Sequence, residues 1–106
     1  MAETVFSEKD LEFLQQGAAQ ATAMLKALSN ENRLLVLCLL MQRGEMSVGA
    51  MLEHIPLSQS ALSQHLGRMR DEGLVAFRRE SQTLYYRIAD PAVEKIIATL
   101  KSIYCP

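Results

Sequence analysis

The apolar residues of this chain change their spacing twice. They recur every three or four residues as far as residue 73, alternate with other residues from 74 to 88, and return to the wider spacing over residues 93–103. Spacings of three and four gather side chains on one face of a helix, whereas alternation gathers them on one face of a strand. The chain is therefore predicted to be mainly helical, with four helices, a β-hairpin and one last helix.

Each expected helix begins at a residue that can cap it, because a short polar side chain can accept a hydrogen bond from the first turn. The expected caps are Ser7, Asn30, Ser47, Ser58 and Asp90. Pro91 suits the first position of the last helix, and Gly44 and Gly73 suit the ends of the second and fourth. The hairpin is expected to turn at residues 81–82 without glycine, with a mobile tip over residues 80–83.

Three helices carry an apolar stripe. The stripe of the first helix consists of Leu11, Leu14, Ala18, Ala21, Leu25 and Leu28. One side of the second is expected to consist of Leu34, Leu37, Cys38 and Met41, which places Cys38 in the core or at its margin. The stripe of the last helix consists of Val93, Ile96, Ile97, Leu100 and Ile103. A small core leaves both terminal stripes in need of cover, so a homodimer through the first and last helices is predicted, with packing inside one chain as the alternative.

The length of the chain limits its organisation. Its 106 residues fit one domain, residues 1–106, and no repeat or long linker divides them. The longest apolar run, residues 34–41, is far shorter than the roughly 20 residues that cross a bilayer, and residues 1–10 contain no basic segment followed by an apolar one. A cytoplasmic protein without a membrane partner is expected.

The charges are unevenly distributed, although the net charge is only −1. Residues 1–31 hold two lysines against five carboxylates, a balance of −3. Residues 58–88 hold five arginines against three carboxylates, a balance of +2. Since the planar guanidinium suits phosphates and guanine edges, this second segment is a candidate nucleic-acid contact.

The fourth expected helix has one polar face. Its apolar residues Leu62, Leu66 and Met69 share the other face, which leaves outward Gln59, Ser60, Ser63, Gln64 and Arg68. Such a helix can enter the major groove, where glutamine pairs with adenine, while the hairpin arginines Arg78, Arg79 and Arg87 would contact phosphates or the neighbouring minor groove. Each feature alone is typical of a solvated surface, but their order predicts a winged helix-turn-helix that binds double-stranded DNA.

Three blocks of the sequence resemble a known family. Residues 28–34 (LSNENRL), 57–66 (LSQSALSQHL) and 69–75 (MRDEGLV) look like the signature blocks of the ArsR/SmtB winged-helix repressors, with Met69 where the family more often has leucine. The resemblance covers about residues 18–105. It implies a homodimer that binds an inverted-repeat operator and releases it on sensing a ligand, with recognition helices roughly 34 to 36 Å apart.

The chain lacks the metal-ligand patterns of the metal-sensing members of this family. The third helix lacks the cysteine pair of arsenic and cadmium sensors, and the last helix lacks the histidine of the zinc sensors, despite Asp90 and Glu94. His54 and His65 are isolated in the sequence. We therefore expect neither a metal site nor a cofactor.

The two cysteines, Cys38 and Cys105, are the remaining candidates for sensing. Taken alone they would be a core thiol and a residue at a frayed end. The resemblance implies instead the dithiol of the sulfide- and persulfide-responsive branch of the family, that of HlyU, BigR and SqrR. It implies reactive sulfur species as the inducer and a disulfide or polysulfide bridge within one subunit. Since Cys105 near the chain end is expected to be accessible and Cys38 lies among leucines, we expect Cys105 to be modified first and Cys38 to resolve it, in a bridge that lowers DNA affinity.

Other functions remain open at this level. A metal-responsive repressor would take up zinc or arsenite stoichiometrically. A small thiol oxidoreductase would turn over a disulfide, but the chain lacks a Cys-x-x-Cys motif, so no enzyme is expected. A protein-interaction module would show no salt-dependent DNA affinity. The Cys105-Pro106 dipeptide could also invite haem. Persulfide and peroxide are alternative inducers, and repression and anti-repression are alternative modes of action.

Overall fold

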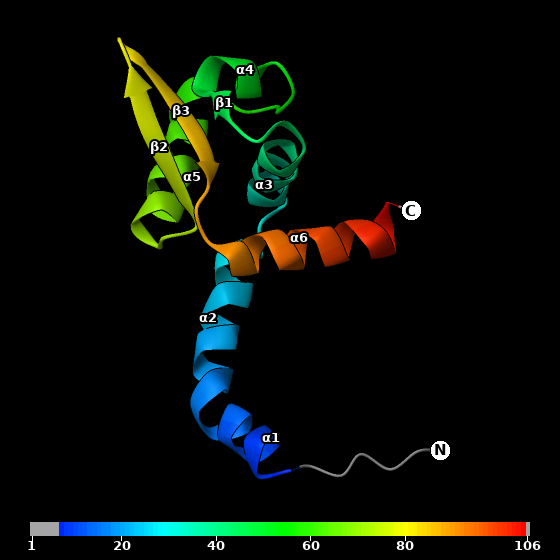
Figure 1. Cartoon of the computed structure of the whole chain (residues 1–106). Helices are drawn as coiled ribbons and strands as arrows, with labels where there is room; N and C mark the ends of the chain where they lie inside the picture. Colours follow the sequence, from blue (N-terminus) through cyan, green and yellow to red (C-terminus); the bar gives the residue numbers. More distant parts are fainter. Residues whose placement is uncertain (1–6, 106) are drawn as a thin grey trace.

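The computed structural model describes residues 7–105. Its elements, in chain order, are α1 (Glu8–Glu12), the π-helical turn η1 (Phe13–Gly17), α2 (Ala18–Leu28), α3 (Glu31–Arg43), β1 (Met46–Ser47), α4 (Val48–Leu52), α5 (Gln59–Asp71), β2 (Val75–Glu80), β3 (Thr83–Ile88) and α6 (Pro91–Tyr104). The predicted fold class, mainly helical with a hairpin wing, is confirmed (Figure 1). Among the described residues, no helix has the length and apolar character needed to cross a membrane.

All five predicted caps are confirmed. The bonds run from the backbone N–H of Asp10, Arg33, Ala50, Ala61 and Ala92 to the side chains of Ser7, Asn30, Ser47, Ser58 and Asp90, at 2.9 to 3.3 Å. Gly44 follows α3 with a φ of 81°, a left-handed conformation that costs glycine little. The helix boundaries are therefore set locally, by residues within one turn of each end.

The sheet has one strand more than the sequence predicted. The short strand β1 pairs antiparallel with β3, through Met46 opposite Tyr86, and β3 pairs with β2, in the order β1-β3-β2. Two residues are too few to show alternation, which is why β1 escaped prediction. The hairpin turns at residues 81–82 as expected, with Glu80 opposite Thr83 and Ser81 at a φ of 58°.

The core lies between α3, α5, α6 and the sheet. Its fully buried side chains include Val36, Leu37 and Leu40 of α3, Leu62, Leu66 and Met69 of α5, Val75 of β2, and Val93 and Ile97 of α6. The inward face predicted for α5 is therefore confirmed. Because α5 packs on α4 and β2, its opposite face is left toward solvent.

The predicted inner side of the second helix is wrong by one step around the helix. The buried residues of α3 are Arg33, Val36, Leu37 and Leu40, whereas Cys38 is exposed. This helix is apolar almost all round from residue 34 to 41, so periodicity could not choose between neighbouring stripes. Leu37 is common to both stripes, and packing against α6 and β3 buried it together with Val36 and Leu40 instead of Leu34, Cys38 and Met41.

The first helix differs from the single uninterrupted helix that its stripe predicted. The π-helical turn η1 separates α1 from α2, and the three form an arm that extends away from the body (Figure 1). Only its last turn enters the core, through Leu28, while Leu11, Leu14 and Leu25 are 48%, 50% and 62% exposed. The radius of gyration is 16.4 Å, against about 13 Å for a compact chain of 100 residues. The arm accounts for this elongation, and among residues 7–105 nothing buries the leucines of its stripe before Leu28.

Candidate nucleic-acid interface and dithiol groove

Helix α5 presents the polar face that the sequence predicted. All five candidate residues on it are exposed, namely Gln59, Ser60, Ser63, Gln64 and Arg68. The other face of the same helix is anchored by Leu62, Leu66 and Met69, each fully buried. Since α4 packs against α5 and the Ser58 cap fixes the start of α5, the two helices form a helix-turn-helix.

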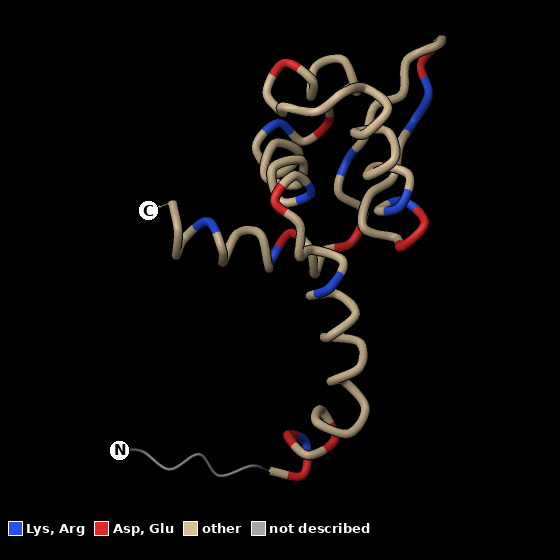
Figure 2. The backbone as a smooth tube through the Cα atoms, turned by 180° about the vertical axis from the view of Figure 1, so that it is seen from behind, with Lys and Arg blue, Asp and Glu red and all other residues tan. Residues whose placement is uncertain are grey.

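The predicted wing arginines lie on two faces of the hairpin. Pairing between β2 and β3 sets Arg87 opposite Ala76 and Arg78 opposite Tyr85, so Arg78 and Arg87 share one face. Arg79 points to the other face, since neighbouring residues of a strand alternate. Figure 2 shows Lys and Arg positions along the hairpin and others at the end of α5. Phosphates on either side of the wing would therefore meet different arginines.

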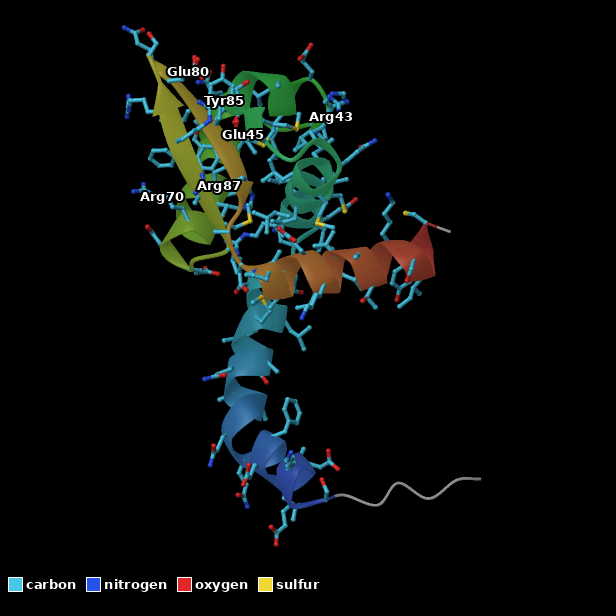
Figure 3. The ribbon with its side chains drawn as sticks, in the orientation of Figure 1. Arg43, Glu45, Arg70, Glu80, Tyr85 and Arg87 are labelled. Carbon is cyan, nitrogen blue, oxygen red and sulfur yellow. The ribbon has the colours of Figure 1, made fainter. Side chains whose placement is uncertain are left out.

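Arg78 is engaged within the chain. Its Nε donates to both carboxylate oxygens of Glu45 at 3.0 Å, and its two terminal nitrogens lie 2.9 Å from Glu45 and 2.6 Å from Glu80. Its guanidinium also stacks 4.6 Å from the ring centre of Tyr85. The hydrogen bonds from Arg78 lower the pKa of Glu45, and the charge of Arg87 adds to this effect. Figure 3 shows Glu45, Glu80, Tyr85 and Arg87 around this part of the wing.

The ion pairs of Arg78 make it a weaker candidate for binding a phosphate than Arg79 and Arg87. Two carboxylates and one guanidinium leave the Glu45–Arg78–Glu80 cluster with a charge of −1, so Arg78 has little charge to offer a phosphate. Arg79 and Arg87 take part in none of the ion pairs found among residues 7–105. Glu45 was not among the predicted site residues, because it lies 33 residues before its partner Arg78 and no local pattern connects them.

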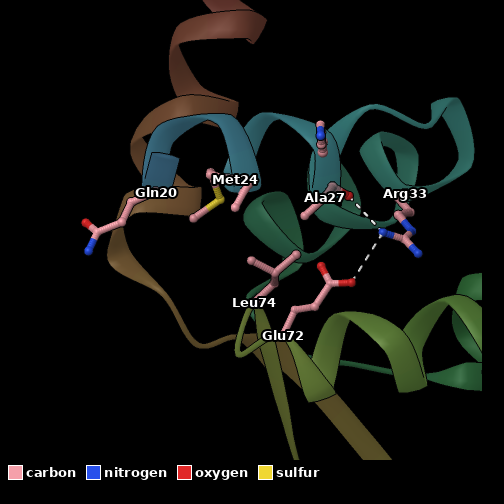
Figure 4. A pocket seen from close by; sticks show the side chains of 8 residues that line it. Gln20, Met24, Ala27, Arg33, Glu72 and Leu74 are labelled. Carbon is pink, nitrogen blue, oxygen red and sulfur yellow. Dashed lines mark hydrogen bonds and ion pairs between the residues drawn. The ribbon is translucent and has the colours of Figure 1, made fainter. Parts of the chain in front are cut away.

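A buried arginine of α3 connects this helix to α2 and to the inner side of α5. Arg33 of α3 is 9% exposed; its NH1 donates to the backbone carbonyl of Ala27 in α2 at 2.9 Å and lies 4.0 Å from a carboxylate oxygen of Glu72 (Figure 4). Its Nε donates to Nδ1 of His65 in α5 at 3.3 Å. His65 therefore supports the helix from behind, and its neutral ring carries its proton on Nε2.

This contact predicts an acid-dependent loss of stability. The pKa of His65 is lowered because burial disfavours the imidazolium and because Arg33 and Arg68 repel it. The unfolded chain, with an ordinary pKa of about 6.5, then binds the proton more readily than the folded one. Stability contributed by neutral His65 is thus present above about pH 6.5 and is lost as the pH falls through the lowered folded-state pKa.

Urea unfolding between pH 5 and pH 7.5 checks this expectation. His65→Asn keeps an acceptor for Arg33 but cannot take up a proton in this range, so we expect its stability to fall less toward pH 5 than that of the parent chain. His54→Asn, at an exposed histidine outside this contact, is the matched control. Equal slopes for His65→Asn and the parent would contradict the expectation.

One groove brings the two cysteines together. It lies between α3 and α6 and encloses about 1000 Å³. Its lining is mostly apolar and includes Leu34, Leu39, Met41, Ile97 and Leu100 beside Cys38 and Cys105. Both cysteines are free thiols and both are exposed, which corrects the buried or marginal position expected for Cys38. Residues 67 positions apart in sequence thus share one site.

The groove perturbs the Cys38 thiol. The residue is exposed because the groove is open, but the apolar walls still withdraw its sulfur partly from water. This burial raises the pKa of Cys38, Cys105 nearby raises it further, and Lys101 opposes the shift. Cys38 therefore ionises less readily than an unperturbed cysteine thiol.

Among residues 7–105, no group of three or more histidine, cysteine, aspartate or glutamate side chains is arranged to hold a metal ion. His54 lines the groove of the two cysteines without completing such a group. For the Cys105-Pro106 dipeptide, Pro106 lies outside the described residues.

Comparison with known proteins gives a consistent result. Residues 30–76 match the family described as "Bacterial regulatory protein, arsR family". The chain is 50% identical over 97 residues to the HTH-type transcriptional regulator YgaV of Escherichia coli (strain K12), covering 92% of this chain and 98% of that protein. Reduced HlyU from Vibrio cholerae N16961 matches with a TM-score of 0.83 and 42% identity, over 90% of this chain and 99% of that one. The repressor BigR from Xylella fastidiosa matches with a TM-score of 0.83 and 32% identity, over 95% and 99% of the two chains.

Proposed function

The chain belongs to the ArsR/SmtB family of winged-helix transcriptional regulators, and from this premise we propose that it is a dithiol sensor of reactive sulfur. As a reduced homodimer it binds an inverted-repeat operator in double-stranded DNA, and bridging of Cys38 to Cys105 releases it. Its relatives are transcriptional regulators rather than enzymes, which confirms the expectation that the chain is not an enzyme and argues against a thiol oxidoreductase.

Support for DNA binding comes from α5 and the wing. The exposed polar face of α5 carries two glutamines that suit adenine edges, and its serines suit phosphates or bases. Arg79 and Arg87 supply free positive charge on the wing, and Arg68 extends the charge along α5. Base contacts from α5 would therefore set sequence preference, and the wing would supply affinity.

Support for the homodimer comes from the arm. Its stripe is exposed at Leu11, Leu14 and Leu25, and Figure 2 shows charged residues at the ends of the arm with none along residues 13–25. An uncharged helical face of this length is typical of a helix–helix interface. Ile103 of α6, 59% exposed, continues the apolar surface on the last helix. Packing of both helices on a second copy would bury these side chains.

The chemistry of sensing requires two sulfur–sulfur exchanges. With an organic tetrasulfide as donor, the Cys105 thiolate attacks an internal sulfur atom; a new S–S bond forms, the central S–S bond breaks, and a persulfide anion leaves. The Cys38 thiolate then attacks the sulfur next to Cys105 and displaces an organic thiolate. The products are a trisulfide bridge, one thiol and one persulfide, so the dithiol has lost two electrons and the donor has gained them.

The shared groove is the observation that carries this proposal. Cys38 lies on α3, whose other face holds Arg33 against α5, and Cys105 follows α6 at the proposed dimer interface. A bridge across the groove would fix α6 against α3 and so couple the dimer arrangement to the helices that read DNA. A coupling of about 1 to 3 kcal/mol changes affinity roughly 5- to 150-fold, enough to empty an operator poised near its dissociation constant.

The test compares operator binding by fluorescence anisotropy for the reduced chain, the tetrasulfide-treated chain and the treated Cys38→Ser and Cys105→Ser variants. We expect treatment to weaken binding by the parent chain roughly 5- to 150-fold and to leave both variants bound. Intact mass should show added sulfur and the loss of two hydrogens in the parent chain. Peroxide treatment, run in parallel, separates a persulfide inducer from general oxidation.

Two outcomes would reject the proposal. Release that persists in either cysteine variant would remove the dithiol mechanism. Tight, stoichiometric uptake of zinc or arsenite that weakens operator binding would favour the metal-responsive alternative.

The recognition helix yields a separate prediction. Gln64→Ala removes a bidentate partner for one base, so operator affinity should fall by about 1 to 3 kcal/mol, and preference at that base pair should relax. Arg79→Ala should weaken binding to all sequences alike and reduce the slope of log affinity against log salt by about one. Gln20→Ala, a glutamine of the arm, is the control for side-chain truncation. Unchanged base preference in Gln64→Ala would contradict the assignment.

A further inference from the structure

The dithiol groove also holds a cation. Lys101 lines it together with Cys38 and Cys105. It precedes Cys105 by four residues, one helical turn, and the backbone N–H of Cys105 donates to the Lys101 carbonyl at 2.8 Å. Cys105 follows the last helical residue of α6, and both Lys101 and Cys105 line the groove that α6 forms with α3.

We propose that Lys101 is a positioning residue of the sensing reaction, whose ammonium stabilises the thiolate of Cys38 and thereby sets how fast this thiol resolves the modified Cys105. The inference rests on the proposed dithiol function and adds to it a residue outside the cysteine pair. It assigns Lys101 an electrostatic role on Cys38 and no covalent one.

Few other groups in the groove could stabilise the Cys38 thiolate. The titratable side chains that face it are Lys101, Tyr104 and Cys105 from the end of α6 and His54 from the segment after α4, while most other lining residues are apolar. Burial and Cys105 both raise the pKa of Cys38, and Lys101 lowers it. A thiolate rather than a thiol is the nucleophile in sulfur exchange, so a group that favours the charged form speeds the reaction.

The apolar walls of the groove strengthen the attraction between the Lys101 ammonium and the Cys38 thiolate. Water screens a charge pair strongly, whereas a partly desolvated pair keeps more of its attraction. The walls of Leu34, Leu39 and Leu100 exclude part of the water around Cys38. The pKa of Cys38 is raised overall, so its thiolate fraction near neutral pH is small even with Lys101 present. Without the ammonium this fraction would be smaller still, and the modified Cys105 would be resolved more slowly.

The test measures thiol reactivity without DNA or a sulfur donor. In a Cys105→Ser background Cys38 is the sole cysteine, and its thiolate attacks the methylene carbon of iodoacetamide while iodide leaves. We expect Lys101→Gln to slow this alkylation about three- to tenfold near pH 7.5 and to move the rate profile to higher pH. Lys101→Arg keeps the charge and should restore the rate to within about twofold. Added salt should narrow the difference between Lys101→Gln and the parent.

Lys95→Gln is the matched control, since it removes the same charge from an exposed position of α6 outside the groove. Equal rates and pH profiles for Lys101→Gln and Lys95→Gln would overturn the inference, and so would a Lys101→Arg variant as slow as Lys101→Gln. Failure of the proposed function would appear elsewhere, as operator binding that ignores tetrasulfide. A Lys101 effect on alkylation could still be observed in that case, so the two failures are distinguishable.

Discussion

Leu25→Glu is expected to convert the reduced protein to a monomer and to lower its operator affinity about 100- to 10,000-fold. Leu25 is 62% exposed on the arm, in a stripe of which only Leu28 is buried among residues 7–105. A carboxylate there would have to be buried against a second copy without a partner, which strongly disfavours association. Each monomer would then hold one half-site, and the high effective concentration of the second reading helix would be lost.

Sedimentation velocity of the reduced protein and anisotropy titration of an operator duplex measure the two effects. Gln16→Glu adds the same charge at an exposed position of the arm outside the stripe, and it should remain dimeric with near-parent affinity. A Leu25→Glu protein that still sediments as a dimer would place the interface elsewhere. A reduced parent chain that is monomeric would reject the dimer altogether.

Leu66→Ala is expected to have the largest effect on stability, a loss of about 2 to 5 kcal/mol in the free energy of unfolding. Leu66 is fully buried on the inner face of α5, at the centre of the core between the helices and the sheet. Truncation removes apolar contact and leaves a cavity that rigid neighbours fill only in part. Since small domains have only about 5 to 15 kcal/mol to lose, a large share of the protein could unfold at 37 °C.

Urea unfolding at a single protein concentration checks this value, because dissociation would couple to unfolding in a dimer. Leu66→Met conserves volume and should cost less than about 1.5 kcal/mol. The polar face of α5 is unchanged in both variants, so their folded fractions should bind the operator as the parent does. A Leu66→Ala protein within 1 kcal/mol of the parent would mean that α5 is not seated as described.

Local signals in the sequence were sufficient for much of the fold. The caps and the hairpin turn depend on bonds between residues a few positions apart, and the printed sequence contains both partners of each. The polar face of α5 was equally readable, because one helix with apolar residues on a single side has only one way to face the core.

The candidate site was less predictable. Arg78 looked like a free cation until the fold brought it to Glu45, and His65 looked isolated until α3 supplied Arg33. The three wing arginines were predicted as one group, yet strand register distributes them over two faces. In each case the partner is distant in sequence, so no local pattern records the pairing.

The sequence by itself determined the order of elements apart from η1 and β1, the capped starts of the helices, the family signature and the outward face of α5, since these follow from periodicity, capping and residue identity over short distances. Only the tertiary structure decided which stripe of α3 is buried, that Cys38 and Cys105 share a groove with Lys101, and that Leu11, Leu14 and Leu25 of the arm are exposed. These features depend on how distant helices pack, and α3 is apolar on so many sides that packing alone could orient it.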